Sequence, residues 1–514
     1  MKLLRSMTTV GGFTIGSRVG GFARDILIAF LLGAGPAMDA LVVAIKLPSL
    51  FRRLLAEGAL NASFIPLFAG IARTQGKQKA KEFAEDIFSI LLVILIIFVV
   101  ATVALMPWIL PICAPGFRHT PERLQLAIQF SQITFPFIFF ISLTALYGGI
   151  LNSFERFAAV AASPMAGNIF ILLLSISLYP LFQQPGIILS LSILGCGLIQ
   201  LMWVSVPCYR LGFNLKPRRP RLTPHVIKFL ARMGPAGLGS GVHQINIVIA
   251  TLIASVLPIG GMSYLYYAER LTQLPLSVIG TAMSTVLLPL LSKQWRAGEF
   301  DNARDSQNQG IEYALLITMP ATVGLVFLAQ PIISTLFEHG RFDPQSSQAT
   351  ANALMALAWG LPAYVLTKIL NTSFYAQENT TTPVIFAGIS VAVDIALSLL
   401  LIRSFHHVGI ALATASAAWV NVVLLATALR KRKFLVFTPK LKRFAVNLVI
   451  TCIGLSTYLE VAKYLVMPWM AYNWPLRLFG LMVLVGGGVC VYTLLGYMTK
   501  LFDFRELKVQ FQRN

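Results

Sequence analysis

Six basic side chains lie inside stretches that are otherwise apolar enough to cross a membrane. They are Arg18, Arg24, Lys46, Arg52, Arg53 and Arg270. A charge at the centre of a bilayer costs at least about 2.5 kcal/mol on insertion scales, so such residues usually line a polar cavity. Guanidinium groups match the geometry of phosphate oxygens. We therefore expect the cavity to take an anion, and a diphosphate suits this number of cations better than a single carboxylate does.

The first apolar stretch combines two of these arginines with an acid and five glycines. Arg18 and Asp25 are seven residues apart and share a helix face, whereas Arg24 lies about 120° away. The glycines permit bending and close helix packing; they are Gly11, Gly12, Gly16, Gly20 and Gly21. The alternative interpretation is packing glycines with a structural Arg18–Asp25 ion pair. One acid cannot neutralise both arginines, however, so we predict a binding role for them.

The second stretch carries a stripe of alternating charge. The spacing places four charged side chains on one face of an ideal helix; they are Asp39, Lys46, Arg53 and Glu57. Arg52 points elsewhere unless Pro48 alters the register. The stripe is formally neutral, so Lys46 could be balanced by Asp39, and Arg53 with Glu57 at i,i+4 could be purely structural. Asp39 lies near the predicted non-cytoplasmic end, where it could pair with a cavity arginine in one state.

Two further charged residues, Glu269 and Asp394, interrupt later apolar stretches. Glu269 and Arg270 adjoin each other before Pro275, and Glu269 is a candidate for an ion pair. Asp394 stands alone among apolar residues, which suits either a cation site or a hydrogen bond to a neighbouring helix. No metal-ligand spacing, glycine-rich phosphate loop or nucleophile elbow is present, so we expect neither an enzyme nor a metal or other cofactor.

The composition places these residues in an all-α polytopic membrane protein. Of 514 residues, 56% are hydrophobic and 12% are charged, against about 25% charged in soluble domains. Hydropathy predicts fourteen spanning helices. Their approximate ranges are 8–33, 37–70, 84–110, 125–152, 157–182, 186–210, 224–257, 261–291, 309–331, 347–375, 381–403, 407–430, 443–465 and 474–499.

Loop charge predicts the orientation of the chain. Roughly 28 basic residues fall in the termini and the loops after even-numbered spans, against six in the other loops. Those six are Arg118, Arg123, Arg341, Arg403, Lys463 and Arg477. The positive-inside rule therefore places both termini in the cytoplasm. It also accounts for the net charge of +21, so no nucleic-acid partner is expected.

An internal repeat organises the predicted helices. Segment 38–47 is echoed by 262–271, 64–67 by 287–290, and 150–154 by 369–374, in the same order and at a nearly common offset. An offset of six helices keeps both halves in one orientation, as in parallel transporter repeats. We predict two pseudo-symmetric six-helix lobes, 1–210 and 229–433, joined by a cytoplasmic linker, 211–228. Residues 434–514 supply two further helices and a cytoplasmic tail.

Several motifs resemble the MurJ (MviN) family of lipid II flippases, within the multidrug/oligosaccharidyl-lipid/polysaccharide exporter superfamily. The resemblance lies in segments 17–25, 33–40, 46–53 and 56–58, and continues through 114–117, 150–152, 233–235 and 266–271. It implies a fourteen-helix fold with a central cationic cavity and a groove for a polyprenyl tail between the last two helices. It also implies essential cavity residues at Arg18, Arg24, Asp39 and Arg270, with Arg52 and Arg53 nearby. The family often has an acid where Gln273 stands here.

The resemblance implies a function in peptidoglycan synthesis at the bacterial inner membrane. The expected activity is alternating access that moves undecaprenyl-diphosphate-linked lipid II from the cytoplasmic to the periplasmic leaflet, coupled to membrane potential or to an ion gradient with Asp394 as its site. A monomer suffices, and membrane lipids and other cell-wall synthesis proteins are the expected partners. The alternatives are a flippase for another polyprenyl-diphosphate glycan or a drug exporter of the same superfamily. A membrane enzyme acting on polyprenyl phosphates would need Asp-rich metal motifs or a histidine nucleophile set, which the sequence lacks.

Overall fold

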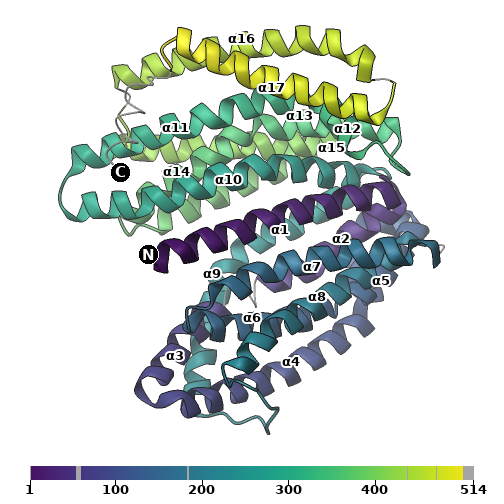
Figure 1. Cartoon of the computed structure of the whole chain (residues 1–514), viewed down its shortest axis with the longest axis vertical. Coiled ribbons are helices and arrows are strands. Elements are labelled where there is room, and N and C mark those ends of the chain that lie inside the picture. Colours follow the sequence, from purple (N-terminus) through teal and green to yellow (C-terminus); the bar gives the residue numbers. More distant parts are fainter. Residues whose placement is uncertain (1, 54–59, 182–183, 437, 471, 502–514) are drawn as a thin grey trace. The chain divides into compact units, whose positions relative to one another are not determined.

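The computed structural model describes residues 2–53, 60–181, 184–436, 438–470 and 472–501. Every regular element in these ranges is a helix (Figure 1). The chain forms two compact units, residues 1–263 and 264–514, which are described here one at a time.

The first unit, in its described residues, packs nine α-helices and two short 3₁₀ helices around aromatic side chains. Phe64, Phe68, Phe83 and Phe213 are buried together in its main core. Figure 1 shows α1 running alongside α7, and these two helices pack closely. The elements are α1 (Lys2–Leu32), α2 (Pro36–Phe51), α3 (Asn61–Thr74), α4 (Gly76–Cys113), η2 (Pro115–His119), α5 (Pro121–Thr134), α6 (Phe137–Ser153), α7 (Phe157–Leu178), η3 (Tyr179–Leu181), α8 (Pro185–Arg210) and α9 (Pro224–Ser255).

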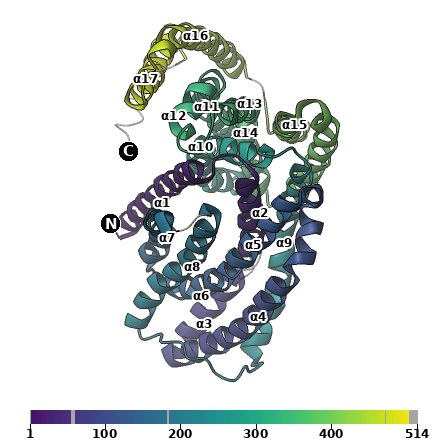
Figure 2. The ribbon, with the colours of Figure 1, turned by 90° about the vertical axis from the view of Figure 1, so that its right-hand side faces the viewer.

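The second unit contains the remaining helices, and α10 starts at the junction of the two units. Its final two helices pair with each other, as Figure 2 shows, and also pack against α11 and α12. The elements are α10 (Gly261–Arg296), α11 (Phe300–Phe327), α12 (Ala329–Phe337), α13 (Pro344–Trp359), α14 (Leu361–Ala376), α15 (Thr381–Lys431), α16 (Pro439–Met470) and α17 (Trp474–Met498).

Proline and short polar residues define where many of these helices begin. Proline occupies the first or second position of α2, α5, α8, α9, α13, α14 and α17. There its fixed φ is helical and its missing N–H would have had no partner in the helix. Before α13, the Asp343 carboxylate accepts a 2.6 Å bond from the Ser346 amide, and Asn473 caps α17 in the same way at 3.1 Å.

Ten helical segments in the described residues are long and apolar enough to cross a membrane. The chain is therefore an all-α polytopic membrane protein. Predicted spans 125–152 and 347–375 each consist of two helices, broken at Pro136 and Gly360. Spans 381–403 and 407–430 are two helices that together make up α15 and are separated by a kink at His406, where φ is 48° and ψ is −125°. The total of fourteen transmembrane helices stays a prediction.

The helix-ending turns recur along the chain at a nearly constant interval. Positive φ angles occur in three pairs of turns with almost equal sequence separation: Gly76 and Gly298, Glu155 and Glu378, and Gly212 and Lys433. The hydrogen bonds of these turns recur as well: the Arg156 amide donates to the Leu151 carbonyl, and the Asn379 amide to the Phe374 carbonyl. The turns therefore share one backbone conformation, and two of the three pairs also have the same residue at the positive φ angle.

This interval corrects one of the three sequence matches. When segments 150–154 and 369–374 are aligned at their first residues, Ile150 corresponds to Ile369. When the turns that follow these helices are aligned instead, Glu155 corresponds to Glu378. The two alignments differ by about one helical turn. Apolar residues recur every three to four positions along a helix, so a short apolar match can slip by one turn without losing its similarity.

The predicted linker is bound along the first unit. Phe213 and Leu215 are buried against its core. The Glu85 carboxylate pairs with Arg218 at 2.6 Å, and the Ser89 hydroxyl accepts a 2.8 Å bond from the Arg218 amide. Extended chain that lacks internal hydrogen bonds needs such partners for its amides. The predicted lobe limits on either side of this linker stay a prediction.

Candidate functional site

A polar cavity of about 220 Å³ lies within the first unit. Its charged walls are Arg24 from α1 and Arg52 from the end of α2, both half-buried. Asn168 of α7 and Gln200 of α8 add amide groups, and Phe137 and Ile171 contribute apolar surface. Two of the six predicted cations therefore converge on one cavity, where guanidinium groups in reduced solvent attract an anion strongly.

Arg24 is held by acceptors on two helices. Its Nε and Nη2 donate to Oδ1 of Asp25 at 3.2 and 2.8 Å, and its Nη1 donates to Oδ1 of Asn168 at 3.2 Å. Asp25 is almost fully buried. Asp25, the acid of the alternative Arg18–Asp25 pair, thus pairs with Arg24, whose long side chain reaches its neighbour. Arg18 itself is half-buried on α1.

The glycines of α1 divide into two groups. A methyl group added at Gly20 or Gly21 would lie 3.4 Å from the Asn168 side chain, and one at Gly16 would lie 2.9 Å from the Met165 sulfur. These three glycines let α1 approach α7 closely enough for Arg24 to reach Asn168. Gly11 and Gly12 face open space instead, so close packing does not explain them.

The predicted charge stripe on the second span is divided in the structure. Helix α2 contains Pro48 and ends at Phe51, and a wider π-type turn begins at Arg52. This change of register turns Arg52 to the cavity and leaves Arg53 exposed. Glu57 lies outside the described residues, so its pairing with Arg53 stays a prediction.

Lys46 lies apart from this pair of arginines. It lines a separate small cavity of about 30 Å³ together with Leu47, Cys113 and Thr251. That volume accommodates about one or two water molecules and no larger ligand. Lys46 is half-buried there, and Asp39 pairs with a different residue.

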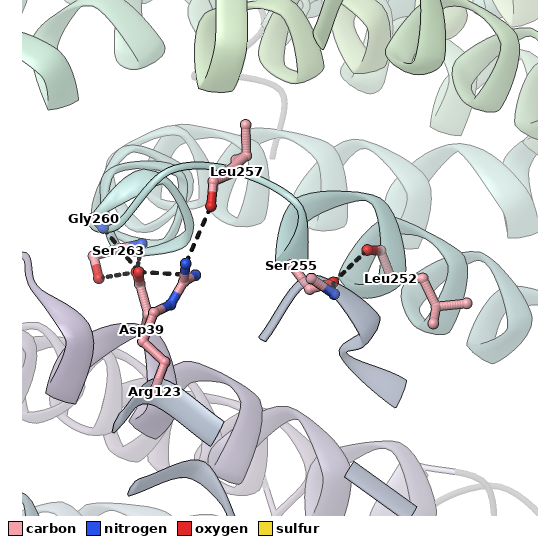
Figure 3. Close-up of polar contacts among 8 residues, drawn as sticks. Asp39, Arg123, Leu252, Ser255, Leu257, Gly260 and Ser263 are labelled. Carbon is pink, nitrogen blue, oxygen red and sulfur yellow. Dashed lines mark hydrogen bonds and ion pairs between the residues drawn. The ribbon is translucent and has the colours of Figure 1, made fainter. Parts of the chain in front are cut away.

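Asp39 forms a buried ion pair with Arg123, as Figure 3 shows. Asp39 Oδ2 lies 3.1 Å from Arg123 Nη2, and the two side chains are 0% and 3% exposed. The pair connects the first turn of α2 with the first turn of α5. Asp39 therefore does pair with an arginine, but not with one of the predicted cavity residues.

The same carboxylate binds the start of α10. The Gly260 amide donates to Oδ2 at 2.8 Å, and the Ser263 amide and hydroxyl donate to Oδ1 at 2.9 and 2.6 Å (Figure 3). The first amides of a helix have no partner within that helix, and its N-terminus carries partial positive charge. Asp39 thus acts as an N-cap that comes from a distant part of the sequence.

Arg123 is positioned by the turn before α5. Its guanidinium lies 4.2 Å above the Phe117 ring, and its Nη1 donates to the Leu257 carbonyl at 3.2 Å. The Gly116 amide donates to the Ser255 hydroxyl at 3.1 Å, and a methyl group at Gly116 would collide with the Ser255 carbonyl. The Ala114–Phe117 motif therefore has a physical role, since it sets η2 directly against the end of α9.

Sequence reasoning did not single out Arg123. It was counted only as one of six basic residues in loops where the positive-inside rule disfavours them. Its place in a predicted non-cytoplasmic loop could have marked Arg123 as a candidate, because a cation retained there needs a structural or functional reason.

The second unit holds the remaining candidate residues. Arg270 is half-buried, with its guanidinium 4.6 Å from the Tyr266 ring and its Nη1 donating to Gln273 Oε1 at 3.4 Å. Glu269, its neighbour, is also half-buried. The Asp394 carboxylate accepts from Thr414 at 3.2 Å and from Ser398 at 3.5 Å. These bonds account for a half-buried acid but do not by themselves make a cation site.

Long apolar helices and a cavity lined by two arginines are typical of a multi-pass membrane protein that binds an anion within the membrane. A family model described as "Lipid II flippase MurJ" matches residues 28–480, and the chain belongs to this family. A "Probable lipid II flippase MurJ" of Rhizobium meliloti (strain 1021) is 40% identical over 92% of this chain and 88% of its own length. The "Lipid II flippase MurJ" of Burkholderia cenocepacia is 34% identical over 87% and 88%.

Solved structures agree with this assignment. "Lipid II flippase MurJ, inward closed conformation" is similar with a TM-score of 0.79 and 26% identity, over 97% of this chain and 99% of that one. An inward-facing multidrug resistance MATE family transporter of the MOP superfamily has a TM-score of 0.67 at 16% identity, covering 81% and 94%. The second likeness concerns the fold alone.

Proposed function

We propose that this chain moves lipid II from the cytoplasmic to the periplasmic leaflet of the bacterial inner membrane. One observation carries the proposal: Arg24 and Arg52, from two different helices, line the same polar cavity in a member of the MurJ family. The diphosphate is the part of such a lipid that resists entering the bilayer, because an unpaired charge in hydrocarbon is very costly. Two guanidinium groups offer it paired, charge-assisted hydrogen bonds.

The full clamp in this proposal adds Arg18 and Arg270 to these two residues, and Lys46 and Arg53, within and just after α2, add positive charge. Fourteen transmembrane helices form two six-helix lobes, and the regular recurrence of the helix-ending turns supports that division. The last two helices, α16 and α17, provide the groove in which the polyprenyl tail stays in lipid. Alternating access then exposes the clamp first to the cytoplasmic and later to the periplasmic side.

The buried Asp39–Arg123 pair is the natural candidate for a contact that closes the predicted periplasmic side. The Asp39 carboxylate also holds the start of α10, so the pair belongs to one buried network with that helix end. Such a contact suits a switch because it is either complete or broken, and a half-made buried ion pair is unfavourable. Asp25 and Glu269 are the other acids positioned to accept a cavity arginine when no substrate is bound.

The energy source in this proposal is the membrane potential, which contributes about 2.3 kcal/mol for each charge moved through 100 mV. An ion gradient is the alternative, with Asp394, Ser398 and Thr414 as the oxygen ligands of its cation. Both termini lie in the cytoplasm, the chain acts as a monomer, and contacts with cell-wall synthesis proteins are made outside the cavity.

Replacement of the clamp arginines tests the proposal in a strain depleted of its own flippase. Arg18→Ala, Arg24→Ala and Arg270→Ala should each abolish rescue while the protein still reaches the membrane. Arg73→Ala, at an exposed arginine on α3, is the matched control and should rescue fully. Full rescue by all three clamp variants would refute the diphosphate site.

The lipid that accumulates upon depletion distinguishes the alternative substrates. Lipid II in the cytoplasmic leaflet supports the proposal, whereas another polyprenyl-diphosphate glycan would replace lipid II as substrate. A cationic-drug exporter would need acids to dominate the cavity wall, but the charged residues that line it are arginines.

A further inference from the structure

We propose that Asn168 is a positioning residue that aims Arg24 at the diphosphate. This inference rests on the proposed function of the cavity. Asn168 lies on α7, is 9% exposed, and contributes to the cavity wall beside Arg24. It carries no charge, so a search of the sequence for cationic residues passes over it.

The Asn168 amide links two points on α1. Its Nδ2 donates to the Ser17 carbonyl at 3.0 Å, and its Oδ1 accepts from Arg24 Nη1 at 3.2 Å. Ser17 and Arg24 are two helical turns apart, so they lie on the same face of the helix. Only one orientation of the amide satisfies both partners, because a flipped amide would place its NH₂ group against a guanidinium and its oxygen against a carbonyl.

Asn168 and Asp25 bind different nitrogen atoms of the Arg24 guanidinium. Asp25 accepts from Nε and Nη2, and Asn168 accepts from Nη1. A planar guanidinium held in this way loses its freedom to rotate before substrate arrives. Such preorganisation improves binding because the ordering cost is already met in the folded protein.

The choice of an amide over an acid has an electrostatic consequence. Asp25 already places one carboxylate beside Arg24. A second carboxylate at position 168 would keep the acceptor but cancel the positive charge that attracts the diphosphate. It would also repel the Ser17 carbonyl. Asparagine supplies the acceptor and a donor without that charge.

The test measures binding of lipid II to the purified full-length chain in nanodiscs. Asn168→Asp should weaken binding about tenfold or more, because the added carboxylate offsets the positive charge of Arg24 and the donor to the Ser17 carbonyl is lost. Asn168→Leu should weaken it similarly while the thermal unfolding profile is retained. The matched control is Asn308→Leu, which removes a buried asparagine that donates to the Val436 carbonyl at 3.1 Å in the second unit. That variant should bind lipid II normally.

A charge exchange separates positioning from simple packing. The double variant Asp25→Asn, Asn168→Asp restores one acid and one amide around Arg24, and should recover binding to within about threefold of the parent protein. A packing role would not produce this recovery. Failure of the folded double variant to recover, or normal binding by Asn168→Asp, would overturn the inference.

Arg24→Ala distinguishes failure of the inference from failure of the proposed function. If Arg24→Ala loses binding and Asn168→Asp does not, only the role of Asn168 is wrong. If Arg24→Ala itself binds lipid II normally, the diphosphate clamp is wrong, and the role of Asn168 is overturned with it.

Discussion

Removal of Arg123 from its pair with Asp39 should strongly destabilise the protein. In Arg123→Leu, the Asp39 carboxylate stays fully buried and loses its only cation among the contacts described. Breaking a buried pair by removing one partner typically costs about 3–5 kcal/mol. Asp39 keeps three hydrogen bonds from Gly260 and Ser263, so we expect the lower end, about 3 kcal/mol. Asp39→Ala also removes the cap of α10 and should cost about 5 kcal/mol.

Thermal unfolding of the purified chain in detergent measures both effects. With a midpoint shift of about 2 °C for each kcal/mol, Arg123→Leu should lower the unfolding temperature by about 6 °C and Asp39→Ala by about 10 °C. Arg118→Leu is the matched control, because this arginine is exposed on the neighbouring turn. Its shift should stay within about 1 °C, as is usual for surface substitutions.

The double variant decides whether the two residues act as a pair. If they do, Asp39→Ala with Arg123→Leu should destabilise the protein by clearly less than the two single effects together, since neither charge is left alone. Additive effects, or a midpoint for Arg123→Leu equal to that of Arg118→Leu, would refute the buried pair as a source of stability.

Two other contacts give predictions of the same kind. Gly116→Ala should lower the unfolding temperature by several degrees because its methyl group meets the Ser255 carbonyl, whereas Gly11→Ala, which faces open space, should not. An unchanged midpoint in Gly116→Ala would show that η2 can move away from α9 at no cost. Glu85→Gln should release the linker from α4, and trypsin should then cut near Arg218 about tenfold faster. Glu82→Gln is its exposed control, and equal cutting rates in the two variants would mean that Glu85 does not hold the linker.

Most helices, and two of the arginines that line the cavity, could be predicted from sequence because both depend on local composition. Apolar runs of about 20 residues identify spans, and arginines inside such runs are rare enough to mark a cavity. Arg24 was found in this way and does line one. The same reasoning could not decide between Arg52 and Arg53, because that depends on where α2 ends and how the next turn widens.

The sequence shows which charged residues lie within the helices, but it does not show which of them pair with each other. An ideal helix offers an Arg18–Asp25 pair as the structural alternative, whereas Asp25 pairs with its neighbour Arg24. Arg123 pairs with Asp39 although the two residues belong to helices far apart in sequence, and no periodicity within one helix contains that information. The neutral residue Asn168 was missed because nothing in its local sequence shows that α1 approaches α7 at that position.

The bond between Asp39 and Ser263 has a consequence for how the two halves of the chain diverged. The repeat aligns Met38-Asp39 with Met262-Ser263, so these residues occupy corresponding positions, and they touch each other at 2.6 Å. Two identical halves would bring aspartate against aspartate here, and like charges at that distance cannot both stay ionised. A hydroxyl in one copy turns that repulsion into a hydrogen bond. At this point the chain is stable because its halves are not alike, so restoring the symmetry of the repeat would weaken the molecule.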